Sequence, residues 1–258
     1  MTTLDDLRVK IFADGASLEG IKEMCAKPWI RGFTTNPTLM RKAGVGDYKS
    51  FALEMLAAVA DRPVSFEVFA DDFDEMERQA LEIASWGSNV DVKIPVTNTR
   101  GEFTGPLIKR LTQEGVKINV TAVFTPEQVE GITANLADET PAIISVFAGR
   151  IADTGVDPVP ILREALKIMR PKPNAELLWA SPRELLNIIQ ADDIGCHIIT
   201  ATTDVLNKLP LLGKDHVHYS LETVEMFHRD AAAAGYTIPI RAAASSHDGG
   251  GAHARGNR

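Results

Sequence analysis

NVDVKIP, residues 89–95, is a short apolar run interrupted by an aspartate and a lysine. Such runs, rich in branched residues, are typical of buried parallel strands. Seven similar runs accompany it along the 258 residues of the chain. From the amino terminus the eight runs are residues 9–13, 30–33, 64–69, 90–94, 116–120, 142–146, 176–179 and 197–199. Several are nearly continuous in apolarity, which predicts strands that are covered on both faces.

Stretches with helical spacing lie between these runs. Asp72, with Glu75 three residues later, resembles a capping box that opens a helix. Thr125-Pro126 gives a cap and a first-turn proline, and Asp157-Pro158 and Ser181-Pro182 repeat this signal. Eight strand–helix units in a chain of this length predict an α/β fold, a (β/α)8 TIM barrel. A doubly wound open sheet is the alternative, but no GxGxxG follows the first run.

The carboxyl-terminal part of the chain differs from the rest in composition. Residues 222–234 are Ala-rich and end at Gly235, which predicts an extra C-terminal helix outside the barrel or against a partner subunit. We expect residues 1–240 to form a single barrel domain that includes this helix. Residues 241–258 are small, polar and Gly-rich, so we expect a disordered tail.

Charge and cysteine content narrow the class of protein. The formal net charge of −8 argues against a nucleic-acid binder, although a few local arginines would suffice for an anionic substrate. Cys25 and Cys196 lie far apart without ligand-like neighbours, so we expect reduced thiols and neither a metal nor another cofactor. The first residues form no apolar signal segment, and no apolar run is long enough to span a bilayer. We therefore expect a soluble, cytoplasmic protein that has no contact with a membrane.

Lys93 is the residue in these runs that most needs an explanation. An inward-facing lysine loses hydration as a cation, and a neutral lysine is a nucleophile toward a carbonyl carbon. The alternative is an outward-facing Lys93 whose stem lies between helices. Alternation does not decide between the two orientations, because both neighbours of Lys93 are apolar.

Other candidate residues, all polar except Phe147, occur in or just after the predicted strands, where barrel enzymes place their functional groups. They are Asp14, Thr34, Asn36, Glu67, Asn119, Thr121, Ser145, Phe147, Arg150, Ser181 and Arg183. Glu67 and Lys93 are equally compatible with a structural ion pair and with catalysis. Asp14 and Asn36 are also compatible with simple turn or cap roles. Arg150 and Arg183 are suited to bidentate phosphate contacts, or they are solvated surface charges.

At this point five segments together resemble the transaldolase family, in the family's order and at its spacing. They are GFTTNPT (32–38), VKIP (92–95) followed by Thr97, NVT (119–121) followed by Phe124, SVFAGR (145–150) followed by Asp153, and ASPR (180–183). The resemblance extends from about residue 10 to residue 210. It implies a barrel enzyme that transfers a dihydroxyacetone unit between sugar phosphates.

The resemblance also implies a role for each matching residue. Lys93 would form a Schiff base with a ketose phosphate, and Asp14 would act as acid and base at the C4 hydroxyl. Glu67 and Thr121 would hold a water that shuttles protons. Asn36 and Asn119 would orient the dihydroxyacetone hydroxyls. Ser181 and Arg183 would bind the phosphate, with Arg150 nearby. Thr34 and Ser145 would line the pocket, and Phe147 would shield it.

Two departures leave the exact reaction open. The chain resembles the compact branch of the family, which also contains fructose-6-phosphate-type aldolases and often forms rings of subunits through a C-terminal helix. Pro182 stands where an aromatic residue is common. We expect a transferase, because Glu67 and Phe147 replace the Gln and Tyr that tend to occur in the aldolases. The resemblance to the compact branch also implies a homo-oligomer. The alternatives are a lyase, an enzyme for a variant sugar anion such as a sulfonated or deoxy sugar, and a catalytically silent binding or assembly barrel.

Overall fold

The computed structural model describes residues 3–240, and its central feature is a closed barrel of eight parallel strands. The strands follow one another around the barrel in sequence order, so that β1 pairs with both β2 and β8. Their bounds are β1 Lys10–Asp14, β2 Ile30–Thr34, β3 Val64–Glu67, β4 Val90–Pro95, β5 Ile118–Val123, β6 Ala142–Val146, β7 Ala175–Trp179 and β8 Ile198–Thr202. The predicted TIM barrel is confirmed, and closure excludes the open sheet.

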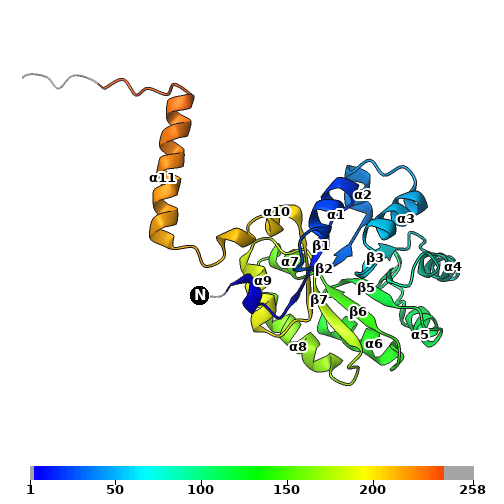
Figure 1. Ribbon diagram of the computed structural model, residues 1–258. Helices are drawn as coiled ribbons and strands as arrows, with labels where there is room; N and C mark the ends of the chain where they lie inside the picture. The colour runs from blue at the N-terminus through cyan, green and yellow to red at the C-terminus, as the bar shows by residue number, and fades with distance from the viewer. Residues whose placement is uncertain (1–2, 241–258) are drawn as a thin grey trace, which may run out of the picture. The chain divides into compact units, whose positions relative to one another are not determined.

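Helices surround the strands on the outside of the barrel (Figure 1). They are α1 Leu18–Cys25, α2 Pro37–Lys42, α3 Tyr48–Ala58, α4 Phe73–Ala84, α5 Gly105–Gln113, α6 Pro126–Asn135, α7 Ala148–Ala152, α8 Val159–Met169, α9 Leu186–Asp193 and α10 Thr203–Leu206, with 3-10 turns at Leu4–Asp6 and Leu209–Leu211. The side chain of Asp72 accepts hydrogen bonds from the N–H groups of Asp74 and Glu75, and Thr125 with Gln128 forms a complete capping box. These caps fix where α4 and α6 begin.

The core has two parts. The larger cluster packs the outer faces of the strands against the helices and includes Phe33 and Phe66. A smaller cluster contains Phe12, Ile143, Leu178, Ala180 and Ile198. Phe12 and Ile143 line a cavity at the amino-terminal ends of the strands, whereas Leu178 and Ala180 line one at the carboxyl-terminal ends. The smaller cluster therefore separates two cavities inside one barrel.

The chain divides into two compact units after Gly213, and the second unit contains α11, His216–Ala233. The C-terminal helix begins at His216 instead of residue 222, because the Asp215 side chain accepts a hydrogen bond from the N–H of His218. Apolar side chains on α11, among them Val217, Leu221 and Phe227, are exposed in the single chain. The domain boundary at residue 240 stays a prediction, and the predicted disordered tail, residues 241–258, lies outside the described residues.

None of the helices within residues 3–240 combines the length and the apolarity that crossing a bilayer requires. Over the same part of the chain, no three His, Cys, Asp or Glu side chains gather as a metal site. Cys25 and Cys196 are both free thiols.

Candidate active site

The carboxyl-terminal ends of the strands surround a cavity of about 500 Å³. All twelve residues singled out in the sequence line this cavity: Asp14, Thr34, Asn36, Glu67, Lys93, Asn119, Thr121, Ser145, Phe147, Arg150, Ser181 and Arg183. Pairing between parallel strands explains the gathering. Glu67 on β3 lies beside Lys93 on β4, and Lys93 lies beside Asn119 on β5. The barrel thus brings together residues that are far apart in the sequence.

Lys93 faces the cavity from β4 and is only 6% exposed. Its Nζ donates a hydrogen bond to the backbone oxygen of Thr35 at 2.8 Å and lies 3.1 Å from Oε2 of Glu67. An outward-facing lysine is excluded by these contacts. A buried ammonium needs a partner of opposite charge, and Glu67 supplies it. The same carboxylate is close enough to accept a proton from Nζ.

Tyr48, the first residue of α3, holds Glu67 in place. Strand β3 pairs with β2 only as far as Ser65, so the peptide group of Glu67 lacks a partner on that side. The Tyr48 hydroxyl accepts a hydrogen bond from the Glu67 N–H at 2.7 Å and donates one to the Glu67 carbonyl oxygen at 3.0 Å. Burial raises the pKa of Tyr48 above its usual range, so the phenol keeps its proton. Edge-on contacts with the rings of Phe66 and Trp86 fix the Tyr48 ring.

Asp14, at the end of β1, is held by two neighbours. Thr34 Oγ1 donates to Asp14 Oδ1 at 2.8 Å, and Asn36 Nδ2 approaches Oδ2 at 3.5 Å. Thr200 Oγ1 lies 2.6 Å from Thr34 Oγ1, so the two threonine hydroxyls and the Asp14 carboxyl group form one hydrogen-bonded row. Burial raises the pKa of Asp14, although the charge of Lys93 and the Thr34 hydrogen bond act in the opposite direction. A carboxyl group of this kind is suited to both accepting and returning a proton.

Asn36 also serves the local structure. Its Oδ1 accepts a hydrogen bond from the Leu39 N–H, which caps α2 ahead of Pro37. Capping leaves its Nδ2 free to point toward Asp14. The cap role and the site role that the sequence left as alternatives therefore coexist in one side chain.

Asn119 on β5 is fixed by neighbours on both sides. Its Nδ2 donates to Ser65 Oγ at 3.1 Å, and its Oδ1 accepts from Ser145 Oγ at 2.6 Å. All three side chains are buried. The two serines determine which way the amide is turned. Thr121 follows on the same strand and is also buried, beside a bulge between β5 and β6.

The arginines lie at the mouth of the cavity. The Arg183 guanidinium donates through Nε to Asp153 Oδ1 at 3.0 Å and through Nη2 to Asp153 Oδ2. The Arg150 guanidinium lies over the Phe147 ring, 5.2 Å from its centroid. Asp153, which follows the SVFAGR segment, thus orients Arg183 at the mouth of the cavity. The hydrogen bond from Arg183 lowers the pKa of Asp153.

The loops after β6 and β7 are in close contact at this end. A Cβ atom added to Gly149 would lie 1.5 Å from the carbonyl oxygen of Ser181, so only glycine fits there. Ser181 has φ = 58°, in the left-handed region. Ala122, with φ = 59°, is the other non-glycine residue with positive φ in the described part of the chain, and both line the cavity. Backbone strain of this kind concentrates at functional sites.

Comparisons with known proteins identify the family of this chain. The family model for transaldolase/fructose-6-phosphate aldolase matches residues 11–247. The chain belongs to this family. A probable transaldolase of Dehalococcoides mccartyi is 36% identical over 78% of this chain and 90% of its own length. A probable transaldolase of Roseiflexus sp. is 37% identical over 78% of this chain and 88% of its own length.

Solved structures show the fold alone. A protein assigned to the dihydrodipicolinate synthase family from Coccidioides immitis superposes with a TM-score of 0.55 at 15% identity. The superposition covers 90% of this chain and 81% of that one. The likeness extends to the barrel, and the similarity that places this chain in the transaldolase/fructose-6-phosphate aldolase family comes from the sequence matches.

Sequence reasoning missed several residues of this transaldolase-family site. Tyr48 and Ser65 orient Glu67 and Asn119, and Asp153 orients Arg183, yet none of the three was among the predicted site residues. Ser65 carried a detectable signal, since it precedes Glu67 by two positions and therefore faces the same side of β3. Lys42 on α2 also lines the cavity, but no sequence pattern points to it.

Proposed function

We propose that this protein is a transaldolase that moves a dihydroxyacetone unit from a ketose phosphate to an aldose phosphate through a Schiff base on Lys93. The observation that carries the proposal is the buried pair of Lys93 and Glu67 in a cavity that Asp14 also lines. Family membership supports the reaction class.

The Schiff base forms through Lys93 and its partner. Glu67, with Oε2 3.1 Å from Lys93 Nζ, accepts a proton and leaves a neutral amine. The amine nitrogen attacks the ketose carbonyl carbon, and the carbonyl oxygen becomes the hydroxyl of a carbinolamine. That hydroxyl leaves as water when it receives the proton from Glu67, relayed by a water molecule held between Glu67 and Thr121. The product is an iminium ion on Lys93.

Asp14 then assists cleavage of the carbon–carbon bond. It takes the proton of the C4 hydroxyl, the bond between C3 and C4 breaks, and its electron pair neutralises the iminium ion as an enamine. The shortened aldose phosphate departs, and an acceptor aldose phosphate takes its place. The enamine carbon attacks the acceptor aldehyde, and Asp14 returns its proton to the new hydroxyl. Burial, which raises the pKa of Asp14, favours this dual use.

The other cavity residues bind and orient the substrate. Asn36 and Asn119 hold the dihydroxyacetone hydroxyls, while Thr34 and Ser145 form the surrounding wall. Ser181 and Arg183 bind the phosphate, with Arg150 beside them, since guanidinium groups pair well with phosphate oxygens. Phe147 keeps bulk water away from the enamine, and its contact with Phe124 at 5.9 Å between centroids supports that role.

Borohydride trapping tests the central step. Incubation with fructose 6-phosphate and borohydride should give a stable adduct on Lys93, located by peptide mass mapping. An adduct on Lys10 or Lys117, together with an active Lys93→Ala variant, would contradict the proposal. Turnover of a panel of ketoses, including sulfonated and deoxy sugars, distinguishes a sugar phosphate from a variant anion. Failure to trap any ketose would indicate a silent binding barrel.

A lyase of the fructose-6-phosphate aldolase type is the second candidate, because the matching family includes both activities. Phe147 favours the transferase, since it has no hydroxyl with which to bind a water and assist protonation of the enamine. Fructose 6-phosphate alone should release little dihydroxyacetone, and erythrose 4-phosphate should bring rapid turnover. Phe147→Tyr should raise cleavage relative to transfer. Equal release with and without an acceptor would make the lyase the better description.

We further infer a cytoplasmic homo-oligomer. The exposed apolar side chains of α11 support self-association, because a row of this kind on a helix is normally covered. Light scattering of the purified chain measures the oligomeric state, and a monomer at micromolar concentration would refute this inference.

A further inference from the structure

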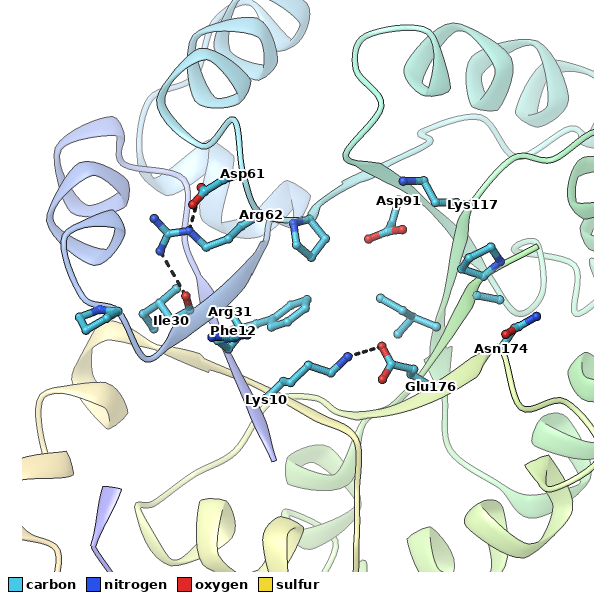
Figure 2. Close-up of a pocket in the computed structure, with 15 residues that line it drawn as sticks. Lys10, Phe12, Ile30, Arg31, Asp61, Arg62, Asp91, Lys117, Asn174 and Glu176 are labelled. Atoms are coloured by element: carbon cyan, nitrogen blue, oxygen red, sulfur yellow. Dashed lines mark hydrogen bonds and ion pairs between the residues drawn. The ribbon is translucent and has the colours of Figure 1, made fainter. Parts of the chain in front are cut away.

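A second cavity, of about 770 Å³, lies at the amino-terminal ends of the barrel strands (Figure 2). Lys10 on β1, Asp91 on β4 and Glu176 on β7 contribute to its wall. Phe12 and Ile143 give it an apolar side, and they belong to the cluster that separates it from the candidate active site. Its residues therefore take no part in the chemistry proposed at the opposite end.

Most charges in this cavity are matched by a neighbour. Lys10 Nζ lies 2.5 Å from Glu176 Oε2, and Arg62 Nε lies 3.1 Å from Asp61 Oδ1. Figure 2 shows both contacts, along with the hydrogen bond from Arg62 to the backbone oxygen of Ile30. These pairs account for two of the cations and two of the carboxylates in the wall.

Among the carboxylates of the cavity wall, Asp91 is the one that has no paired neighbour in the described chain. Its side chain is buried, with the residue only 7% exposed, and it lines the cavity. No hydrogen bond or ion pair joins its carboxyl group to any residue between 3 and 240, and Figure 2 draws none. Burial, together with the nearby charge of Glu176, raises the pKa of Asp91 to about 6, while the charges of Lys117 and Lys10 act in the opposite direction. The Asp91 carboxyl oxygens reach the open space of the cavity, since Trp179 Nε1 is the fully buried side-chain atom without a partner in the described chain. A ligand that supplies a donor in the cavity would therefore pair with them.

Positive charge in the cavity is also incompletely matched. Arg31 on β2 lines the rim of the cavity, is exposed to solvent, and makes no hydrogen bond or ion pair within the described chain. Lys117 Nζ donates to the backbone oxygen of Ser88, which is a neutral partner. Asp91, Arg31 and Lys117 thus make no ion pair within the described chain, although the charge of Lys117 acts on Asp91, and they surround an apolar surface formed by Phe12 and Ile143.

We propose that this cavity is a binding site for a small zwitterion, an amino-carboxylate whose ammonium group pairs with Asp91 and whose acid group pairs with Arg31 and Lys117. A simple anion would meet the buried Asp91 carboxylate, and a simple cation would meet the unmatched Arg31 and Lys117. A divalent metal ion is disfavoured, because the described residues provide no cluster of three ligating side chains here. The methylene chain of an amino acid fits the apolar side of the cavity.

Calorimetric titration of the full-length protein tests the proposal at pH 7.5. The probes are glycine, β-alanine, 4-aminobutyrate and 6-aminohexanoate, which share both charges and differ in the distance between them. Butylamine and butyrate, each with one charge, are the controls. At least one zwitterion should bind with a dissociation constant in the millimolar range or below, and both controls should bind at least tenfold more weakly. The chain length that binds best reports the spacing of the two charged poles.

Variants assign the binding to the named residues. Asp91→Asn and Arg31→Met should each weaken binding of the best zwitterion at least tenfold. Arg41→Met, at an exposed arginine on α2 outside both cavities, and Glu67→Gln, in the other cavity, should leave that binding unchanged. Binding of none of the four zwitterions overturns the proposal. So does unchanged binding in Asp91→Asn, or butylamine binding as tight as that of 4-aminobutyrate.

Discussion

Asp91 and Lys93 stand two residues apart on β4, and each faces one of the two cavities in the same barrel. Both are charged and almost completely buried. Lys93 has its counter-charge and an acceptor inside the protein, in Glu67 and the Thr35 carbonyl group. Asp91 has neither. The difference teaches that burial alone does not define a site: Lys93 is held in place by protein groups, whereas Asp91 is the group that the proposed ligand would pair with.

The largest expected effect comes from removing the satisfied charge. Lys93→Met deletes the nucleophile, and we expect transfer activity to fall on the order of 10⁴-fold or more. Borohydride should then trap no adduct with fructose 6-phosphate. Lys117→Met, which changes a lysine at the opposite end of the barrel, is the control and should retain adduct formation. Substantial transfer activity in Lys93→Met would contradict the assignment of the chemistry to the cavity at the carboxyl-terminal ends of the strands.

Arg183→Ala is expected to have the next largest effect. A charge-assisted hydrogen bond contributes roughly 1.5–3 kcal/mol, so kcat/KM for a phosphorylated ketose should fall about ten- to a hundredfold. The loss should be much smaller for an unphosphorylated ketose. Asp153→Asn should cause a smaller loss in the same direction, because Asp153 only orients Arg183. An equal loss on both substrates would mean that Arg183 has a structural role.

Tyr48→Phe tests whether Glu67 needs its support. The variant keeps the ring packing but removes both hydrogen bonds to the Glu67 peptide group. We expect kcat to fall about tenfold with little change in KM, because each lost hydrogen bond costs roughly 0.5–1.5 kcal/mol. The pH dependence of kcat should shift as well. Tyr236→Phe, at an exposed tyrosine, is the matched control. A change in thermal stability without a change in the pH profile would argue against a positioning role.

Asp91→Asn should give the smallest effect, visible in stability. Because the pKa of Asp91 in the folded protein, about 6, lies above the ordinary value of an aspartate, the stability that Asp91 contributes is present at low pH and is lost as pH rises through 6. The substitution removes this dependence. Relative to the natural chain, its free energy of unfolding should therefore rise by about 1 kcal/mol between pH 5 and pH 7.5. Denaturant unfolding at both pH values measures this difference, and no difference would mean that Asp91 is already paired. Lys10, Lys117 and Glu176, whose charges act on Asp91, are the same in the natural chain and in the variant, so the comparison isolates the Asp91 carboxyl group.

The sequence predicts the architecture well because the strands are defined by local apolarity. All eight runs become strands, but some ends differ. The run at residues 64–69 ends as a strand at Glu67, since the N–H groups of Phe69 and Ala70 donate to Gln79 on α4. The predicted helix start at Ser181-Pro182 is wrong. Helix α9 begins at Leu186, because the N–H groups of Arg183 and Glu184 donate to the Asn187 side chain instead.

The site is predictable only in part. Motif order points to the residues that face the substrate, and the barrel brings them to one cavity. The orientation of Lys93 cannot be obtained from alternation, because a closed barrel buries both faces of β4. Tyr48 is harder to predict, since it acts from the start of a helix on a strand 19 residues away. Asp91 looked like an interruption in an apolar run, and its lack of a partner becomes visible only when all neighbours are placed.

The contact between Gly149 and Ser181 has a consequence for the history and redesign of this enzyme. Because no side chain fits at position 149 while the Ser181 carbonyl group stays in place, the start of α7 and the loop after β7 constrain each other at this contact. Recombination between relatives should therefore succeed when crossover points keep residues 145–183 together, and should fail when a crossover separates them. Libraries that aim at new acceptor sugars should exchange this segment as one cassette.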